Sequence, residues 1–257
     1  VGLVVDRAGT RREPEGAWLV GADGARSAVR GCLELGFDGM TFPETTLLAT
    51  TDFEFRDHLS HLSGVNYCWA ANGTFSLLRL PGEWRVSLYP DDGETVEQAL
   101  MPDAIEAKLQ RIVRRTERYR VLQNRPYRIH QRVVQRYRVG RVLLAGDAAH
   151  VNSPSGGMGM NSGIHDAFNL SEKLLRVLRG EPDTLLDLYE RQRRPIAIEH
   201  VLAQSGRNRA RMQERDRAGR REILRELQAI AADPERCLAH LLRTSMIDGL
   251  RQAARVS

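Results

Sequence analysis

Apolar and polar positions change period along the chain, and these changes predict its architecture. Between residues 42 and 89, aromatic and β-branched residues recur in short runs, as is typical of strands. Asn72-Gly73 and Pro81-Gly82 separate these runs with turn-forming pairs. The region is therefore predicted to be an antiparallel sheet.

Three further apolar runs predict strands outside that region. Residues 1–6 and 17–22 are short apolar runs divided by a charged, glycine- and proline-containing segment, which favours a hairpin-like pair. Residues 141–145, apolar without a break from Val142 to Ala145, give the pattern of a strand buried on both faces. The chain is thus expected to combine two kinds of sheet.

Helical spacing of apolar residues predicts three helical regions. The first covers residues 104–118, with Asp103 as its cap. The second follows the glycine-rich loop 153–159 and ends at Gly180. The third covers residues 184–256. A strand, a loop and a helix are therefore consecutive around the glycine-rich loop.

Composition places the chain among globular proteins. Its 257 residues are 42% hydrophobic and 28% charged, enough for a sizeable core. The net charge of +5 would suit nucleic acid, an anionic cofactor or acidic substrates, so charge alone does not choose among them. No apolar stretch is long enough to span a membrane and no signal peptide is evident, so a cytoplasmic protein is expected.

Cysteine and histidine spacing argues against a metal site and against disulfides. Cys32, Cys68 and Cys237 are odd in number and never form a CxxC pair. His58 and His61 have no third ligand nearby in the sequence. We therefore expect free thiols and no metal.

The segment after the run at 141–145 carries the clearest chemistry. Asp147 follows a buried strand, and open α/β sheets bind ligands at that end, so its carboxylate could accept a ribose hydroxyl. The loop at 154–161 is rich in glycine, which lets backbone approach a planar ligand, and it opens a helix whose amino terminus favours negative charge. The alternative is that Gly156, Gly157 and Gly159 only form a tight turn.

Two motifs resemble those of the para-hydroxybenzoate hydroxylase family. The segment from Gly146 to Asn169 resembles the family's Gly-Asp motif, and the segment from Gly21 to Arg30 resembles its Asp-Gly motif. The members are class A flavoprotein monooxygenases. The resemblance implies that NAD(P)H reduces FAD, that molecular oxygen forms a flavin C4a-hydroperoxide, and that a phenolic or related aromatic ring is hydroxylated.

The resemblance also implies a set of cofactor-binding positions. These are Asp23, Gly24, Arg30, Gly146, Asp147, Pro154, Gly157, Met158, Gly159, Met160 and Asn161. Local alternatives exist for some of them: Asp23 could only end a strand in an Asp-Gly turn, and Arg30 could be a solvated helix residue. His150 is expected to satisfy local backbone rather than to contact the cofactor. The catalytic residues are not identified.

By analogy, an aromatic substrate is expected beside the antiparallel sheet. The candidate contacts are Tyr67, Trp69, Phe75, Arg79 and Tyr89. Because strand side chains alternate between faces, about half of such a set would belong to the core instead.

The predicted fold class is mixed α/β: a truncated, Rossmann-like FAD-binding domain, an antiparallel-sheet substrate domain and carboxy-terminal helices. The family's GxGxxG turn does not occur in the sequence, so the opening nucleotide-binding segment is expected to be missing. The expected divisions are residues 1–41 with the Asp-Gly motif, 42–138 as substrate domain, 139–181 with the Gly-Asp motif, and 182–257 as helical region.

Two rival functions remain open from sequence. Flavin-dependent reductases and halogenases have related folds, and the two motifs do not separate them from monooxygenases. The second rival is a nucleic-acid-binding module, because residues 191–225 hold 11 arginines against 4 acids. Interspersed acidic and apolar residues favour solvated amphipathic helices over that reading, so no nucleic acid is expected as a partner. The oligomeric state stays undetermined.

Overall fold

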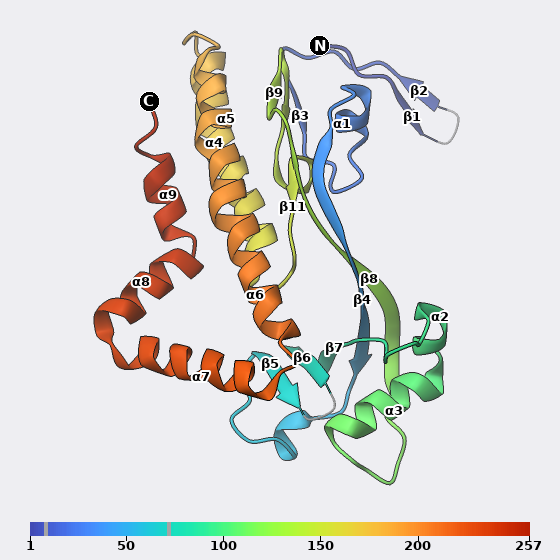
Figure 1. Cartoon of the computed structure of the whole chain (residues 1–257). Helices are drawn as coiled ribbons and strands as arrows, with labels where there is room; N and C mark the ends of the chain where they lie inside the picture. Colours follow the sequence, from blue (N-terminus) through green and yellow to red (C-terminus); the bar gives the residue numbers. More distant parts are fainter. Residues whose placement is uncertain (8–9, 71–72) are drawn as a thin grey trace. The chain divides into compact units, whose positions relative to one another are not determined.

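The chain forms two compact units (Figure 1). The computed structural model describes residues 1–7, 10–70 and 73–257. Unit 1 comprises Val1–Met40, His130–Arg209 and Ile223–Ser257, and unit 2 comprises Thr41–Ile129 and Ala210–Glu222. Each unit therefore gathers segments that lie far apart in the sequence.

The strands fall into three sheets, with orders β1-β2, β3-β10-β9 and β11-β8-β4-β7-β6-β5. Two long strands, β4 and β8, pass from one unit into the other. The strands are β1 (Val5–Arg7), β2 (Thr10–Arg12), β3 (Leu19–Gly21), β4 (Phe37–Thr51), β5 (Val65–Ala70), β6 (Gly73–Leu80), β7 (Glu83–Leu88), β8 (Val121–Val134), β9 (Arg138–Val139), β10 (Val142–Leu144) and β11 (His150–Val151).

Helices make up most of the chain after β11. The α-helices are α1 (Ala28–Cys32), α2 (Val96–Ala99), α3 (Pro102–Ile112), α4 (Met158–Leu178), α5 (Leu185–Ile196), α6 (Ala203–Gln213), α7 (Arg217–Ala232), α8 (Pro234–Thr244) and α9 (Ile247–Ala253). Short 3-10 turns cover Phe55–Asp57 and Gly146–Ala148, and a π-helical stretch, Ala197–Leu202, joins α5 to α6. The predicted mixed α/β class, with an antiparallel sheet and carboxy-terminal helices, is confirmed.

The hairpin predicted between residues 1–6 and 17–22 is wrong. Strand β1 pairs with β2, whereas β3 pairs in parallel with β10, so that Leu19 lies opposite Val142 and Gly21 opposite Leu144. Strand β10 is buried along its whole length, and covering it with apolar β3 removes more apolar surface from water than an exposed hairpin would. A partner more than a hundred residues away cannot be read from local pattern.

Unit 2 is an antiparallel sheet with a helix packed on one face. Strand β7 pairs with β4 and β6, and β6 pairs with β5. Leu47, Leu77 and Val86 are completely buried against Ile105 and Leu109 of α3. The predicted sheet is present. Of its predicted turn at Asn72-Gly73, Asn72 lies outside the described residues.

Two helix predictions need correction. Helix α3 begins after Met101 and ends at Ile112, so Asp103 lies in its first turn rather than at its cap. Helical spacing predicts one apolar face of α4 with Ala167, Leu170, Leu174, Leu175 and Leu178; Leu170 is buried and Leu174 half-buried, but Ala167, Leu175 and Leu178 are exposed. The buried residues of the helix are Met158, Ser162, Asp166, Leu170 and Lys173. Polar contacts, described below, hold this face inside.

Among the described residues, no helix is long and apolar enough to cross a membrane.

Candidate functional site

The two sequence motifs meet in unit 1 where β3 and β10 end. The Ala145 amide donates to the Gly21 carbonyl at 3.0 Å, continuing the parallel pairing beyond the strands. A Cβ atom on Gly21 would lie 2.8 Å from the Leu144 side chain, so the close packing of the strands requires glycine. The carboxyl ends of two parallel strands, where open α/β sheets bind ligands, therefore carry both motifs.

Asp23 holds the start of helix α1 in the Asp-Gly motif, whose N-cap is Ser27. Its carboxylate accepts hydrogen bonds from the Ser27 hydroxyl at 2.5 Å and from the Val29 amide at 3.1 Å. Partial burial raises the pKa of Asp23, but these hydrogen bonds outweigh it and hold the pKa below its ordinary value. Gly24 follows with a φ of +85°, which favours glycine. Asp23 is exposed, so a free carboxylate edge still faces solvent.

Arg30 connects the two motifs. Its guanidinium donates to the Ala148 carbonyl at 2.9 Å and to the Ala25 carbonyl at 2.7 Å, and it stacks 3.9 Å from the centre of the Phe37 ring. Arg30 is half-buried, so the solvated-helix alternative does not describe it. These contacts hold helix α1 of the Asp-Gly motif against the turn that contains Asp147 and Ala148.

The Gly-Asp turn presents Asp147 to solvent. Gly146 has a φ of +62°, and a Cβ atom there would lie 3.7 Å from the Gly163 backbone of α4. The turn continues through Ala148, which is completely buried, while Asp147 between them is exposed. The backbone is thus fixed on both sides of an accessible carboxylate.

The glycine-rich loop leads directly into the amino terminus of α4. Gly156 and Gly157 are exposed with φ values of +101° and +66°, and Gly157 is the N-cap of this 21-residue helix. No side chain caps this end, and its first N–H groups have no partner within the helix. Such an end concentrates about half a positive charge and favours an anionic ligand.

Of the other positions predicted to bind the cofactor in this loop, some are exposed to a ligand and others are buried or hold the loop in place. Pro154 and Met160 are exposed, Met160 by 75%. Met158 is buried. The Asn161 side chain donates to the Gly157 carbonyl at 2.8 Å. A Cβ atom on Gly159 would lie 3.0 Å from the Asn152 side chain, so glycine at this position also serves packing.

Sequence reasoning missed a buried polar cluster behind the turn. Asp166 of α4 and Arg193 of α5 are fully buried, with Arg193 Nε 2.8 Å from Asp166 Oδ1. His150 Nε2 lies 2.8 Å from Asp166 Oδ2. Burial alone would raise the pKa of Asp166, but hydrogen bonding to His150 and the charge of Arg193 hold the pKa below its ordinary value. Only the place of Asp166 within the Gly-Asp motif hinted at this role.

The candidate substrate residues lie on different faces of the unit 2 sheet. Cross-strand register places Tyr67 and Trp69 on one face, and Phe75 on the opposite face with the α3 core. Tyr67 is 50% exposed and Trp69 half-buried. Arg79, four residues after Phe75 and on its face, is exposed. Tyr89 follows β7 and is half-buried. The five residues therefore do not converge on one site.

A cavity of about 750 Å³ lies in unit 2 and includes two of these residues, Phe75 and Tyr89. Its other walls come from the start of β6, the middle of β4, helix α3 and residues 213–220. This volume falls in the range of small-molecule sites.

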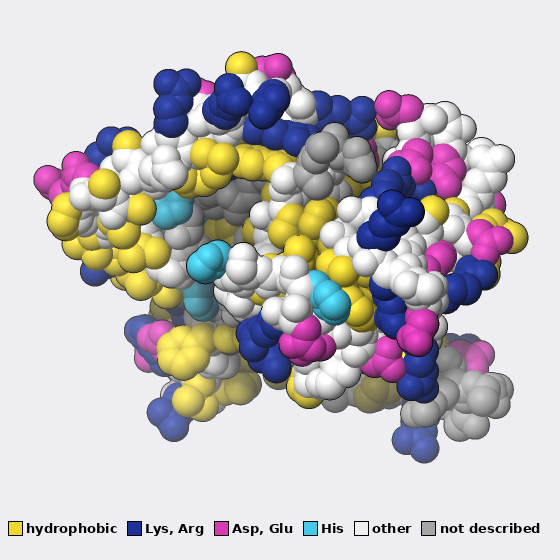
Figure 2. Space-filling view, turned by 90° about the horizontal axis from the view of Figure 1, so that it is seen from below, with side chains coloured by type: hydrophobic (Ala, Val, Ile, Leu, Met, Phe, Trp, Pro, Cys, Tyr) yellow, Lys and Arg dark blue, Asp and Glu magenta, His cyan; other side chains and the backbone are white. Residues whose placement is uncertain are grey.

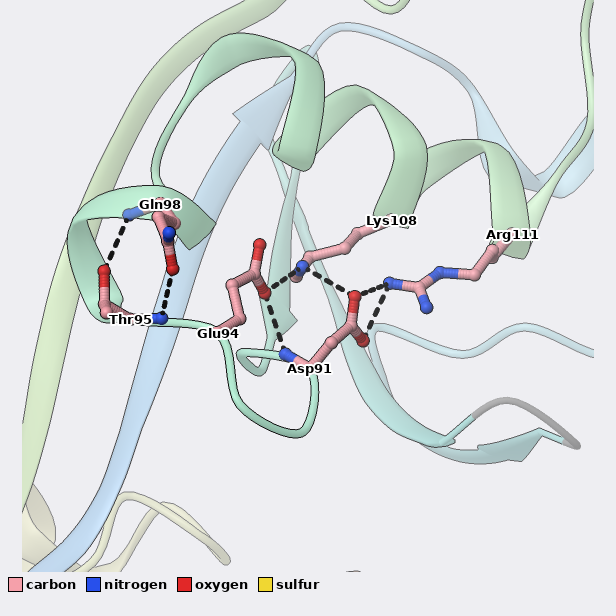
Figure 3. Close-up of polar contacts among 6 residues, drawn as sticks. All are labelled: Asp91, Glu94, Thr95, Gln98, Lys108 and Arg111. Carbon is pink, nitrogen blue, oxygen red and sulfur yellow. Dashed lines mark hydrogen bonds and ion pairs between the residues drawn. The ribbon is translucent and has the colours of Figure 1, made fainter.

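Charged side chains form one wall of this cavity (Figure 3). Lys108, only 4% exposed, reaches Glu94 at 2.6 Å and Asp91 at 3.1 Å. Arg111 donates to both Asp91 oxygens. The Arg111 hydrogen bonds hold the pKa of Asp91 below its ordinary value. The wall is therefore a neutralised cluster and not a patch of one sign.

Among the described residues, no group of three or more histidine, cysteine, aspartate or glutamate side chains could hold a metal ion. The three cysteines are free.

Comparison with known proteins identifies the class. Residues 2–204 match the family described as "FAD binding domain", and the chain belongs to this family. The Asp-Gly and Gly-Asp motifs lie within the matched residues.

The relatives include named monooxygenases. The chain is 38% identical over 205 residues to a flavin-dependent monooxygenase of Mycobacteroides abscessus, covering 77% of this chain and 42% of that protein. It is 35% identical over 212 residues to para-nitrophenol 4-monooxygenase of Pseudomonas sp., covering 79% and 51%. The crystal structure of p-nitrophenol 4-monooxygenase PnpA from Pseudomonas putida aligns with a TM-score of 0.85 and 29% identity, over 97% of this chain and 63% of that one. The chain spans about half the length of the curated relatives it matches.

Proposed function

We propose that this chain supplies the flavin-side half of the FAD site in an NAD(P)H-dependent monooxygenase that hydroxylates a phenolic or related aromatic substrate with molecular oxygen. One observation carries the proposal: the exposed carboxylate of Asp147 stands at the carboxyl end of a buried strand, on a turn that packs against α4, whose amino terminus is uncapped. Family membership and the named relatives support it.

The residues present fit FAD. Asp147 would accept a hydrogen bond from a hydroxyl of the ribityl or ribose chain. The exposed Gly156-Gly157 backbone and Pro154 would border the isoalloxazine ring, and the start of α4 would stabilise negative charge at its pyrimidine end. Asp23 and Arg30 would support the site from the Asp-Gly motif. When bound, FAD supplies electron transfer from NAD(P)H and the activation of oxygen.

Unit 2 is the proposed substrate-binding part. An aromatic substrate needs apolar, ring-shaped contacts and exclusion of water. The sheet offers Tyr67 and Trp69 on one face and Phe75 and Tyr89 at the cavity near the other. Because NAD(P)H is an intracellular reductant, we place the reaction in the cytoplasm.

Binding of nucleic acid is not the function we propose. Several arginines of residues 191–225 have partners within the chain: Arg193 pairs with Asp166, Arg194 donates to the Val134 carbonyl, and Arg215 lies 3.3 Å from Asp92. Figure 2 shows basic side chains along the upper edge of the displayed face, and basic and acidic side chains interspersed over the rest of it. The expected target is therefore a small molecule.

The first experiment tests the cofactor site. FAD is titrated by flavin fluorescence into the protein expressed from its complete reading frame, as wild type and as Asp147→Ala. Loss of a hydrogen bond from a buried hydroxyl costs about 1–3 kcal/mol, so affinity is expected to fall about 5- to 150-fold. The matched control is Glu172→Ala, an exposed acid of α4 located 15 residues after the N-cap, or about 22 Å along the helix. Equal affinity of Asp147→Ala and the control would contradict the site.

The second experiment tests the reaction. The reduced holoenzyme is mixed with oxygen-18 in the presence of a phenolic panel, and label is sought in the products. Labelled hydroxylated product is expected, together with faster NAD(P)H oxidation when a suitable phenol is added. Reduction of a carbon–carbon double bond would instead identify a reductase, and halide-dependent chlorination a halogenase.

A further inference from the structure

One buried carboxylate joins three elements behind the candidate cofactor site. Asp166 Oδ1 accepts from Arg193 Nε at 2.8 Å, and Asp166 Oδ2 lies 2.8 Å from His150 Nε2. The same Oδ2 accepts from the backbone amide of Gly146 at 3.1 Å. Gly146 directly precedes Asp147. Asp166 therefore contacts the backbone of the same turn that presents the Asp147 carboxylate to solvent.

The cluster is fully internal. Asp166 and Arg193 are 0% exposed and His150 is 1% exposed. The Ser162 hydroxyl accepts from the Arg193 guanidinium at 3.5 Å, and the Tyr137 ring stacks on His150 with centres 6.2 Å apart. A buried ion pair offers little stability compared with apolar packing of the same volume, because both charges lose their hydration. The Asp166–Arg193 pair instead restricts the surrounding groups to one geometry.

The turn closes with one hydrogen bond of its own, from the Ala149 amide to the Gly146 carbonyl at 2.8 Å, but this bond does not involve the Ala145–Gly146 peptide. Gly146 has a φ of +62°, and glycine has no intrinsic preference between positive and negative φ. The hydrogen bond from the Gly146 amide to Asp166 selects one orientation of the Ala145–Gly146 peptide, which leads into the turn. Arg193 and His150, in turn, fix both oxygens of the Asp166 carboxylate.

We propose that Asp166 is a positioning residue for the cofactor site, which fixes the Gly146 amide and so aims Asp147 at a cofactor hydroxyl, with Arg193 and His150 orienting its carboxylate. This inference rests on the proposed function, because it needs Asp147 to contact FAD. A purely structural Asp166 would only attach α4 to α5.

Tyr189 provides a matched control. Its hydroxyl is buried in the same core and donates to the Leu144 carbonyl at 2.7 Å, two residues before Gly146. Tyr189→Phe removes a buried hydrogen bond to the strand without touching the turn. Its effect measures what general loosening of this core does to cofactor binding.

The experiment compares FAD affinity and urea unfolding of the protein expressed from its complete reading frame. Asp166→Asn is expected to weaken FAD affinity roughly 10- to 100-fold, by analogy with residues that orient metal ligands, whose replacement costs about that much. Tyr189→Phe is expected to stay within about twofold of wild type, because the turn remains fixed. An equal loss of FAD affinity in Asp166→Asn and Tyr189→Phe would overturn the inference.

A double-mutant cycle then separates positioning from stability. If Asp166 acts through Asp147, adding Asp166→Asn to the Asp147→Ala variant lowers FAD affinity by less than about twofold. If instead the double variant loses affinity by the product of the two single losses, the positioning role is refuted. Should wild type fail to bind FAD, the proposed function fails first; a binding wild type with multiplying losses sinks this inference alone.

His150 gives a second route if Asp166→Asn does not fold. His150→Gln keeps an amide donor near the position of Nε2, whereas His150→Leu removes it. Affinity for FAD is expected to be retained by His150→Gln and lost by His150→Leu. An equal loss in both would show that the contact to Asp166 is not what holds the site.

Discussion

Replacing Arg30 tests whether the two motifs depend on each other through a contact that local sequence does not show. Arg30→Met removes the two hydrogen bonds to the Ala148 and Ala25 carbonyls and the stacking on Phe37. The Ala148 bond is the costly one, because Ala148 is completely buried and its carbonyl loses a charged donor. The variant keeps an apolar stem of similar length, so lost packing contributes little.

The magnitude follows from these contacts. A hydrogen bond to a charged group contributes about 1.5–3 kcal/mol, and the stacked guanidinium adds about 0.5–1 kcal/mol. Since Arg30 is only half-buried, we take the lower part of the sum and expect about 2 kcal/mol less free energy of unfolding. Arg30→Lys keeps the charge but not the forked geometry, and about half that loss is expected.

Urea unfolding followed by circular dichroism measures the free energy, and an FAD titration is run on the same samples. The control is Arg26→Met, an exposed arginine of the same motif, expected to stay within about 0.5 kcal/mol of wild type. An Arg30→Met variant as stable as this control would refute the structural tie. Lost FAD affinity with unchanged stability would instead support the cofactor contact that the family resemblance implies.

Three further predictions follow from other contacts. Lys108→Met should destabilise unit 2 by about 1–3 kcal/mol in urea unfolding, and Arg111→Met by under about 1 kcal/mol, because Lys108 is buried and Arg111 partly exposed. Since the pKa of Asp166 is lowered, its stabilisation is present above about pH 3.8 and lost as the pH falls below that value, so the stability gap between wild type and Asp166→Asn should shrink in acid. Substrate KM should rise for either Tyr67→Ala or Phe75→Ala, but not for both, because they lie on opposite sheet faces.

The sequence predicted what local chemistry decides. The apolar run at Val142–Leu144, the glycine-rich loop and the end of α4 before Gly180 all follow from short-range pattern, and all are present. The partner of β3 was missed because parallel pairing joins residues more than a hundred positions apart. Nothing in residues 17–22 distinguishes a hairpin partner from a distant strand.

The candidate site divides in the same way. The Asp-Gly and Gly-Asp motifs were found, and the structure places them side by side at β3 and β10. The support behind them was not found, because Arg193 belongs to an arginine-rich segment whose pattern suggests a solvated face. Its complete burial depends on Asp166, which lies 27 residues earlier. An ion pair of this kind leaves no periodic trace in the sequence.

Helix α4 shows how the missed residues and the site are connected. It buries Ser162 and Asp166 together with Met158 and Leu170, while Ile164 and Phe168 are exposed. The rotation of this helix about its axis is therefore set by apolar packing and by the contacts of Asp166 with Arg193 and Gly146 together. Because the same helix begins at the glycine-rich loop, fixing its rotation also fixes where its first N–H groups point. A single buried carboxylate thus couples both halves of the proposed flavin site, the Asp147 turn and the amino terminus of α4.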